Sequence, residues 1–292
     1  MWLKSMIMIK CSVFFILVSL FIHQAQANNS DKQINWNQSD WPPFMISKGQ
    51  NAGQGQLDKL WALIIREMPD YQHHKVVMNW SRIYKTMQSG EPLCNISAYK
   101  TKERETFAYF SRANNLILPH AVIIRKSDWV KLGSPKSYDL NKLLLNNNWV
   151  GQVESLRSYG LEIDKLIKQN TSNISFSTAQ ANRLIKMLIN NRIDYFIEYP
   201  LIVDYVYQQE FSQPSDEELV YLKINEAPQY LLGYTACTKS PWGKKVIESV
   251  DIAIEKLIST PGYQSALSAW LSNASQAEYQ QLYQQTLISK TK

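Results

Sequence analysis

The order of apolar and polar residues predicts alternating strands and helices in the first part of the chain. "LDKLWALIIREM", residues 57–68, places its apolar side chains on one helical face and stops before Pro69. The segment "SRIYKTMQSG" has a capping Ser81 and a terminal Gly90, which predict a second, shorter helix. Three segments have the composition of strands: 33–41, 73–80 and 91–99. This β-α-β-α-β order predicts a parallel sheet with helices on its faces.

The same rhythm starts again after residue 130 and predicts a second α/β unit. The predicted strands are 147–155, 174–178 and 192–200, and the predicted helices are 157–169 and 179–191. Two extended apolar segments, 116–125 and 229–238, join the two units, and the rest of the chain after residue 240 is predicted to be helical. Because ligands of open parallel sheets lie beyond the carboxyl ends of the strands, functional residues are expected in four loops: 36–41, 97–104, 153–159 and 197–199.

The amino-terminal segment has the pattern of a secretory signal peptide. Lys4 and Lys10 precede the apolar run "CSVFFILVSLFI", and the small residues of "AQA" end at Ala27. The apolar run is shorter than the roughly 20 residues that cross a bilayer, which disfavours a membrane anchor. We expect cleavage after Ala27 and export of residues 28–292.

Charge and cysteine content narrow the function further. The net charge of +6 is spread along the chain without blocks of like charge, so nucleic acid is not an expected partner. No spacing of histidine, cysteine and acidic residues resembles a metal site, and no phosphate loop is present, so neither a metal nor a cofactor is expected. The two cysteines of the exported chain, Cys94 and Cys237, either form a disulfide in an oxidising compartment or are buried as thiols.

Several segments resemble family 3 of the extracellular solute-binding proteins, the polar amino-acid type. "DWPPF" resembles the family's aromatic-x-Pro-Phe turn, and "MQSGEPLCNISAYKTKERETFAYFS" resembles its segment of helix, strand and T-x-x-R motif. "VGQVESLRSYG" resembles the start of the family's second lobe, and "INNRIDYFIEYP" its Gly-Arg-x-Asp strand. "GYTACTKSPWGKKVIESVDIAIEKLISTPGYQSALSAWL" resembles the return strand and closing helices, so that the resemblance covers nearly all of 33–272.

The resemblance implies a two-lobe α/β fold of the type II periplasmic-binding-protein kind, with two crossover connections and a ligand cleft between the lobes. The first lobe would comprise residues 28–118 and 230–292, and the second lobe residues 119–229. It also implies a monomer of the Gram-negative periplasm that captures a small carboxylate-bearing solute, such as an amino acid. An inner-membrane ABC permease or a sensor would receive this solute.

The resemblance also assigns candidate ligand-binding residues in the first lobe. Arg104 matches the arginine that binds the ligand's α-carboxylate, and a guanidinium can form two parallel bonds to such a group. Ser97 matches a strand-end position that would bond to the same carboxylate, or it satisfies its own backbone instead. Trp41 matches an aromatic residue that stacks on the ligand, and Trp80 either faces the cleft or packs in the core.

In the second lobe, the resemblance implies that the turn at the start of a helix binds the ligand carboxylate, and Ser158 is the hydroxyl residue of this turn. In the family, an acid five residues after the strand's first aspartate binds the ligand ammonium. Counted from Asp194, this position is Tyr199, and Glu198 comes one residue earlier, so either Glu198 or Tyr199 faces the ligand. The family also places the strands of Cys94 and Cys237 side by side, which favours a disulfide.

Two other functions remain open from the sequence. One is a secreted lyase-type enzyme that uses Glu198 as acid or base, although we expect a binding protein rather than an enzyme. The other is a partner-binding periplasmic protein that makes contacts through the segment after residue 273.

Overall fold

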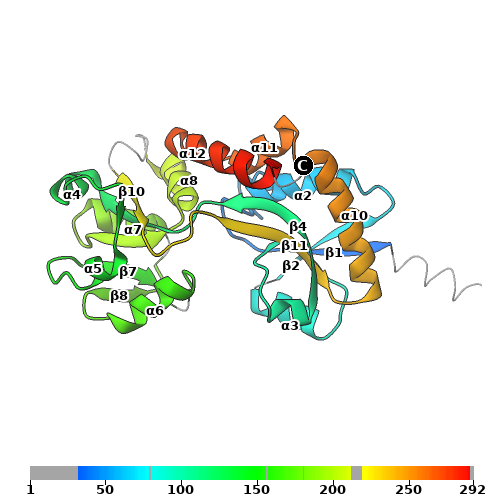
Figure 1. Cartoon of the computed structure of the whole chain (residues 1–292), viewed down its shortest axis with the longest axis horizontal. Coiled ribbons are helices and arrows are strands. Elements are labelled where there is room, and N and C mark those ends of the chain that lie inside the picture. Colours follow the sequence, from blue (N-terminus) through cyan, green and yellow to red (C-terminus); the bar gives the residue numbers. More distant parts are fainter. Residues whose placement is uncertain (1–31, 79, 156, 180, 212–218, 290–292) are drawn as a thin grey trace, which may run out of the picture.

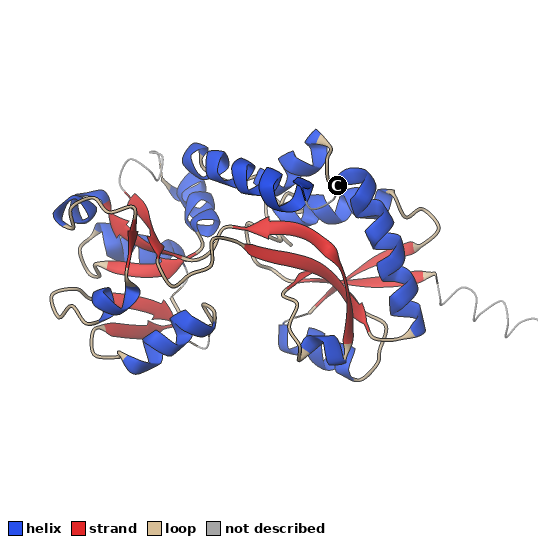
Figure 2. Cartoon of the chain, viewed as in Figure 1, coloured by secondary structure: helices blue, strands red, loops and turns tan. Residues whose placement is uncertain are grey.

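The protein folds into two lobes, each built on its own sheet (Figures 1 and 2). The structure is a computed structural model that describes residues 32–289 except 79, 156, 180 and 212–218. The expected signal peptide, residues 1–27, lies outside the described part of the chain. Within that part, no helix is both long and apolar enough to span a bilayer.

The sheet of the first lobe has five strands in the order β2-β1-β3-β11-β4. Their bounds are Gln33–Gln38 for β1, Gln72–Val77 for β2, Cys94–Ala98 for β3, Ala108–Ile117 for β4 and Leu231–Thr238 for β11. Strands β2, β1 and β3 are parallel as predicted, whereas β11 runs antiparallel to both β3 and β4. The sheet is therefore mixed: β11 returns from the other lobe and runs in the opposite direction to its neighbours.

Helices cover the first sheet where the apolar periodicity predicted them. They are α2 (Gln56–Arg66), α3 (Trp80–Gln88), α10 (Pro241–Leu257) and α11 (Pro261–Ser268), with a 3-10 turn η1 at Arg104–Thr106. The buried face of α2 carries Leu57, Leu60 and Ile64, which pack in one core with Ile34 and Trp36 of β1. This core fixes the edge of the sheet from which the loops after β1 and β3 emerge.

The sheet of the second lobe has six strands in the order β6-β10-β5-β9-β7-β8. The strands are β5 (Ala121–Arg125), β6 (Ser137–Tyr138), β7 (Gly151–Glu154), β8 (Ile174–Ser177), β9 (Tyr195–Glu198) and β10 (Leu219–Ile224). The helices are α4 (Lys126–Lys131), α5 (Leu140–Leu144), α6 (Leu161–Gln169), α7 (Ala181–Ile189) and α8 (Pro200–Glu210). Strands β8, β7 and β9 are parallel, and their carboxyl ends therefore open toward the same edge.

The chain passes between the sheets twice. Residues 118–120 connect β4 to β5, and residues 225–230 connect β10 to β11 (Figure 1). Helix α8 was not predicted, and it contacts both lobes: Leu201 and Ile202 belong to the first lobe's core, whereas Val203 lies in the core of the second. The exact residue boundaries of the lobes stay a prediction, because α8 packs on both sides.

The segment after residue 273 also belongs to the fold. Helix α12 (Asn273–Tyr283) and the π-helical turn η2 (Gln284–Ile288) place Tyr279, Tyr283 and Leu287 in the first lobe's core. The amino end of α12 reaches the second lobe, where buried Asp204 of α8 accepts a hydrogen bond from the Ser272 backbone N–H at 3.0 Å. This segment therefore fastens the two lobes beside the crossings instead of projecting as a free tail.

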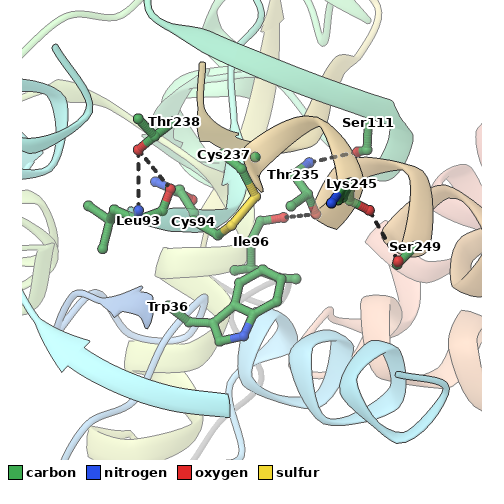
Figure 3. The surroundings of a disulfide bond; sticks show 12 residues. Trp36, Leu93, Cys94, Ile96, Ser111, Thr235, Cys237, Thr238, Lys245 and Ser249 are labelled. Atoms are coloured by element: carbon green, nitrogen blue, oxygen red, sulfur yellow. Dashed lines mark hydrogen bonds between the residues drawn. A yellow bond between two sulfur atoms is a disulfide. The ribbon is translucent and has the colours of Figure 1, made fainter. Parts of the chain in front are cut away.

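A disulfide links Cys94 of β3 to Cys237 of β11 (Figure 3). The two cysteines are direct partners in the antiparallel register of these strands, and neither is exposed. Thr238, next in the chain, binds the neighbouring strand as well, because its hydroxyl accepts from the Leu93 N–H at 3.2 Å. The expected disulfide is confirmed, and it joins the return strand to the strand that carries Ser97.

Candidate functional site at the lobe junction

Four loops from the two sheets meet at the junction of the lobes, as the positions of the strand ends predicted. The loops after β1 and β3 bring Trp41 and Tyr99, and the loops after β7 and β9 bring Arg157 and Tyr199. The hydroxyl groups of Tyr99 and Tyr199 are hydrogen-bonded at 2.9 Å, and the ring of Trp41 meets that of Tyr199 edge-on at 6.2 Å. Tyr199 therefore connects the two lobes through side-chain contacts.

Tyr199 is the central aromatic residue of this junction. It begins helix α8 as its N-cap, with Pro200 in the first helical position, where a proline is well tolerated. Its ring stacks on His120 with the centroids 3.7 Å apart and meets Phe44 edge-on. Burial, reinforced by the neighbouring Tyr99, raises the pKa of Tyr199 well above its ordinary value. The phenol therefore stays neutral and acts as a hydrogen-bonding group.

Glu198, the other candidate of this strand end, is paired with a cation of its own lobe. Both of its carboxylate oxygens accept from the Arg157 guanidinium, from Nη1 at 2.6 Å and from Nη2 at 2.5 Å. The Tyr199 backbone N–H donates a further bond to Glu198 at 2.7 Å. Only 3% of Glu198 is exposed, so a ligand would meet a carboxylate that is already bidentately bound.

Arg157 itself is held on several sides. Its Nη1 also donates to Glu154 at 3.1 Å, and its Nη2 lies 3.4 Å from Nε2 of His120. The guanidinium carbon lies over the ring of Tyr159 at 5.2 Å. Burial by itself would lower the pKa of Arg157, but the charge of Glu198 raises it above its ordinary value. The guanidinium therefore stays charged in this half-buried place.

His120 lies in the first crossing and completes this cluster. It is 4% exposed, and it contacts Tyr159 edge-on in addition to its stack on Tyr199. Burial, with a further contribution from the Arg157 charge, lowers the pKa of His120 well below its ordinary value. The His120 imidazole is therefore neutral, and it packs on Tyr199 next to the Arg157–Glu198 ion pair.

Arg104 lies on the first-lobe side in the turn η1 and is half-buried. Its Nη1 donates to the Tyr99 carbonyl at 2.9 Å, and its guanidinium lies 4.4 Å from the centroid of the Tyr84 ring. None of the ion pairs among the described residues includes Arg104. The guanidinium is thus oriented by neutral groups, which leaves its charge without a carboxylate partner in that part of the chain.

The two candidate serines are bonded within their own lobes. The Ser97 hydroxyl donates to Oδ1 of Asn115 at 3.0 Å, close to Gly233, where a Cβ would lie 2.4 Å from the same hydroxyl. The Ser158 hydroxyl donates to Asp164 at 2.5 Å, and the other oxygen of Asp164 accepts from the Tyr159 N–H. The structure therefore brings Trp41 and Tyr199 into contact, whereas Ser97 and Ser158 serve local bonds.

Trp80 begins helix α3, and its side chain lies outside the described part of the structure. The ligand-binding roles of all these residues stay predictions, because geometry alone assigns them no ligand. Among the described residues, no three histidine, cysteine or acidic side chains gather as a metal site would require.

Arg157, Tyr99 and His120 were not among the predicted site residues. Arg157 stands beside Ser158 in the turn that attracted attention, and its spacing of three from Glu154 was the available signal of pairing. Its bond to Glu198 joins residues 41 positions apart, which no local pattern reveals. Tyr99 ends the predicted strand 91–99 and His120 lies within the extended segment 116–125, and only their contacts at the junction distinguish them.

No protein-family model and no curated protein matches this chain. Among solved structures, it is similar to the second substrate-binding domain of Lactococcus lactis GlnP in open conformation, at 12% identity and a TM-score of 0.60, covering 82% of this chain and 95% of that one.

Two further solved structures share the fold. An amino acid ABC transporter substrate-binding protein of Streptococcus pneumoniae, AbpA bound to L-arginine, is 19% identical with a TM-score of 0.57, and the match covers 85% of this chain and all of that one. An ancestral cationic amino acid solute binding protein is 14% identical with a TM-score of 0.61, and the match covers 85% and 99%. These similarities establish the fold class: the chain has the two-lobe α/β fold of periplasmic binding proteins.

Proposed function

We propose that this protein is an exported solute-binding protein that captures a small carboxylate-bearing solute between its lobes. It would work in the periplasm and deliver the solute to an inner-membrane ABC permease or to a sensor. Support comes from the signal-peptide pattern, from the two-lobe fold and from the substrate-binding proteins that share this fold.

The observation that carries the proposal is the set of contacts made by the Arg104 guanidinium. A half-buried guanidinium at a lobe junction, oriented by a carbonyl and a tyrosine ring and without an acidic partner among the described residues, is suited to bind an anion. Each charge-assisted hydrogen bond to a carboxylate contributes roughly 1.5–3 kcal/mol. Two such bonds, together with aromatic contacts from Trp41 and Tyr199, are compatible with micromolar affinity, which needs about 8 kcal/mol.

The test is a thermal-shift screen of the exported chain against amino acids, dicarboxylates and aromatic acids, followed by calorimetry on the compounds that bind. A ligand that binds only the native state raises the melting temperature according to its concentration relative to Kd, so weak binders are detectable at millimolar concentration. Replacing Arg104 by alanine should weaken binding at least tenfold, a loss of about 1.4 kcal/mol or more. Lys102→Ala is the matched control, because this exposed cation of the same turn should leave affinity unchanged.

If the Arg104→Ala variant bound the identified solute as tightly as the parent, this assignment of the site would fail. The lyase alternative gains no support from the structure, because both oxygens of its proposed acid or base, Glu198, are bound by Arg157. The alternative of a partner-binding tail is weakened by the packing of α12 into the first lobe's core.

A further inference from the structure

The charged groups at the lobe junction restrict the kind of solute that can bind there. The junction loops carry four carboxylates: Asp40 and Glu103 are exposed to solvent, whereas the guanidinium of Arg157 binds both Glu154 and Glu198. Glu198 is almost fully buried, whereas the Glu154 side chain is 42% exposed and directed in part to solvent. The buried acid of the site is therefore neutralised from within the protein.

The pairing of Arg157 with Glu198 is geometrically complete. A planar guanidinium that meets both oxygens of one carboxylate forms the arrangement that binds most strongly and most specifically. Arg157 is also enclosed by the rings of Tyr159 and Tyr199, at 5.2 and 5.5 Å from its central carbon. A cationic group of a ligand would have to displace this guanidinium from a half-buried position in order to reach Glu198.

A second guanidinium is linked to the first by a short chain of contacts. Arg104 donates to the carbonyl of Tyr99, the Tyr99 hydroxyl is bonded to that of Tyr199, and the Tyr199 ring faces Arg157. A solute that contacts this pair of tyrosines would therefore lie close to both arginines. His120, the remaining titratable group packed on Tyr199, is neutral and adds no negative charge.

We infer that the site selects carboxylates that carry no ammonium group and rejects zwitterionic amino acids of the same shape. The inference rests on the proposed solute-binding function and specifies the substrate class of that same site. A ligand ammonium group would be desolvated near two guanidiniums, and the buried acid of the described junction residues, Glu198, is already paired with Arg157; such an uncompensated charge is costly. The anionic end of the ligand, by contrast, can bind Arg104, which has no acidic partner in the described part of the chain.

The first experiment compares matched probes that differ only in the amino group. Calorimetry would measure glutarate against L-glutamate and 3-phenylpropionate against L-phenylalanine on the exported chain. We expect at least one of the two amine-free probes to bind at least tenfold more tightly than its partner. Equal or tighter binding of the amino acids would overturn the inference while leaving the solute-binding function intact, and binding of none of the four probes would count against both.

The second experiment tests the internal cation without relying on any solute. Arg157→Ala leaves an empty cation position facing Glu198, and millimolar methylguanidinium should refill it and raise the melting temperature of this variant. The parent protein should show no such shift, and neither should Arg157→Ala/Glu198→Gln, in which the buried charge is absent. Failure of methylguanidinium to stabilise Arg157→Ala would overturn the inference even if carboxylates bind.

A milder variant covers the case in which Arg157→Ala does not fold. Glu198→Gln keeps the size of the side chain but frees donors of Arg157 for a ligand anion. We expect the amine-free probes to bind Glu198→Gln at least threefold more tightly than the parent, with the amino acids still disfavoured. Tighter binding of the amino acids in this variant would contradict the role assigned to Arg157.

Discussion

The ends of strands β3 and β9 face each other across the lobe junction, and the protein holds them in different ways. Strand β3 is tied to β11 by the Cys94–Cys237 disulfide, which lies in the body of the sheet. Strand β9 is held at its very end, where Glu198 binds Arg157 of the neighbouring loop. The first lobe therefore uses a covalent link away from the site, whereas the second lobe uses charged groups of the site itself.

This difference decides which chemistry remains available to a ligand. On the first-lobe side, the link between the strands uses no polar group, and Arg104 has no acidic partner among the residues that the structure describes. On the second-lobe side, Glu198 and Arg157 neutralise each other, and removing one partner of such a buried pair strongly lowers the stability of the fold. Free anion-binding capacity is therefore expected in one lobe and structural rigidity in the other.

The largest effect is expected from removing the covalent link. The disulfide closes a segment with a sequence separation of 143, for which the chain-entropy model gives about 5 kcal/mol. Cys94→Ala/Cys237→Ala should lower the free energy of unfolding by about 5 kcal/mol, measured by urea denaturation. Reducing agent should destabilise the parent but not this variant, and an equal response of both proteins would show that the link does not stabilise the lobe.

The next largest effect is expected at the end of β9. Arg157→Ala leaves the buried Glu198 carboxylate uncompensated, and losses of about 3–5 kcal/mol are typical of such changes. Replacing both residues by methionine should recover most of this loss, because no buried charge then remains. Denaturation of both variants measures the difference, and similar stabilities for the single and the double variant would rule out the ion pair as the cause.

A smaller effect is expected from pH through His120. Its pKa is lowered in the folded protein, chiefly by burial, whereas in the unfolded chain it has the ordinary value of about 6.5. Below that pH the unfolded chain binds a proton that the folded protein does not, so stability should fall by up to about 1.4 kcal/mol per pH unit. His120→Gln should show a shallower decrease between pH 6.5 and pH 5, and equal slopes would contradict the assignment.

The smallest effect on stability is expected at Arg104. Its charge is not paired with an acid among the described residues, and its contacts are made with neutral groups at a half-exposed turn. Arg104→Gln should therefore change the free energy of unfolding by no more than about 0.5 kcal/mol. A loss of several kcal/mol in a thermal or chemical denaturation would mean that Arg104 is a structural residue like Arg157.

Much of this architecture follows from local sequence patterns. The helical periodicity of 57–68 and the strand composition around Cys94 and Val153 place elements that the structure contains, because apolar faces of known period must be buried. Parallel strands bring their carboxyl ends together, and this rule located the four loops that carry Trp41, Tyr99, Arg157 and Tyr199.

Other features depended on contacts that a linear pattern does not encode. Proline at position 200 ended the predicted strand correctly, but it also begins helix α8, whose two faces serve different lobes and therefore show little amphipathic contrast. The sequence left the choice between Glu198 and Tyr199 open. In the structure, Glu198 binds Arg157, whereas Tyr199 forms a hydrogen bond with Tyr99 of the other lobe.

The sequence by itself determined the number and order of the α/β units and the position of their functional loops, since these follow from burial and backbone geometry. Only the tertiary structure decided that Cys94 meets Cys237, that Arg157 neutralises Glu198 and that Arg104 has no acidic partner among the described residues. The physical reason is that pairing of charges and sulfur atoms requires distances of a few ångströms, and residues far apart in sequence reach such distances only when the chain folds and brings their strands and loops together.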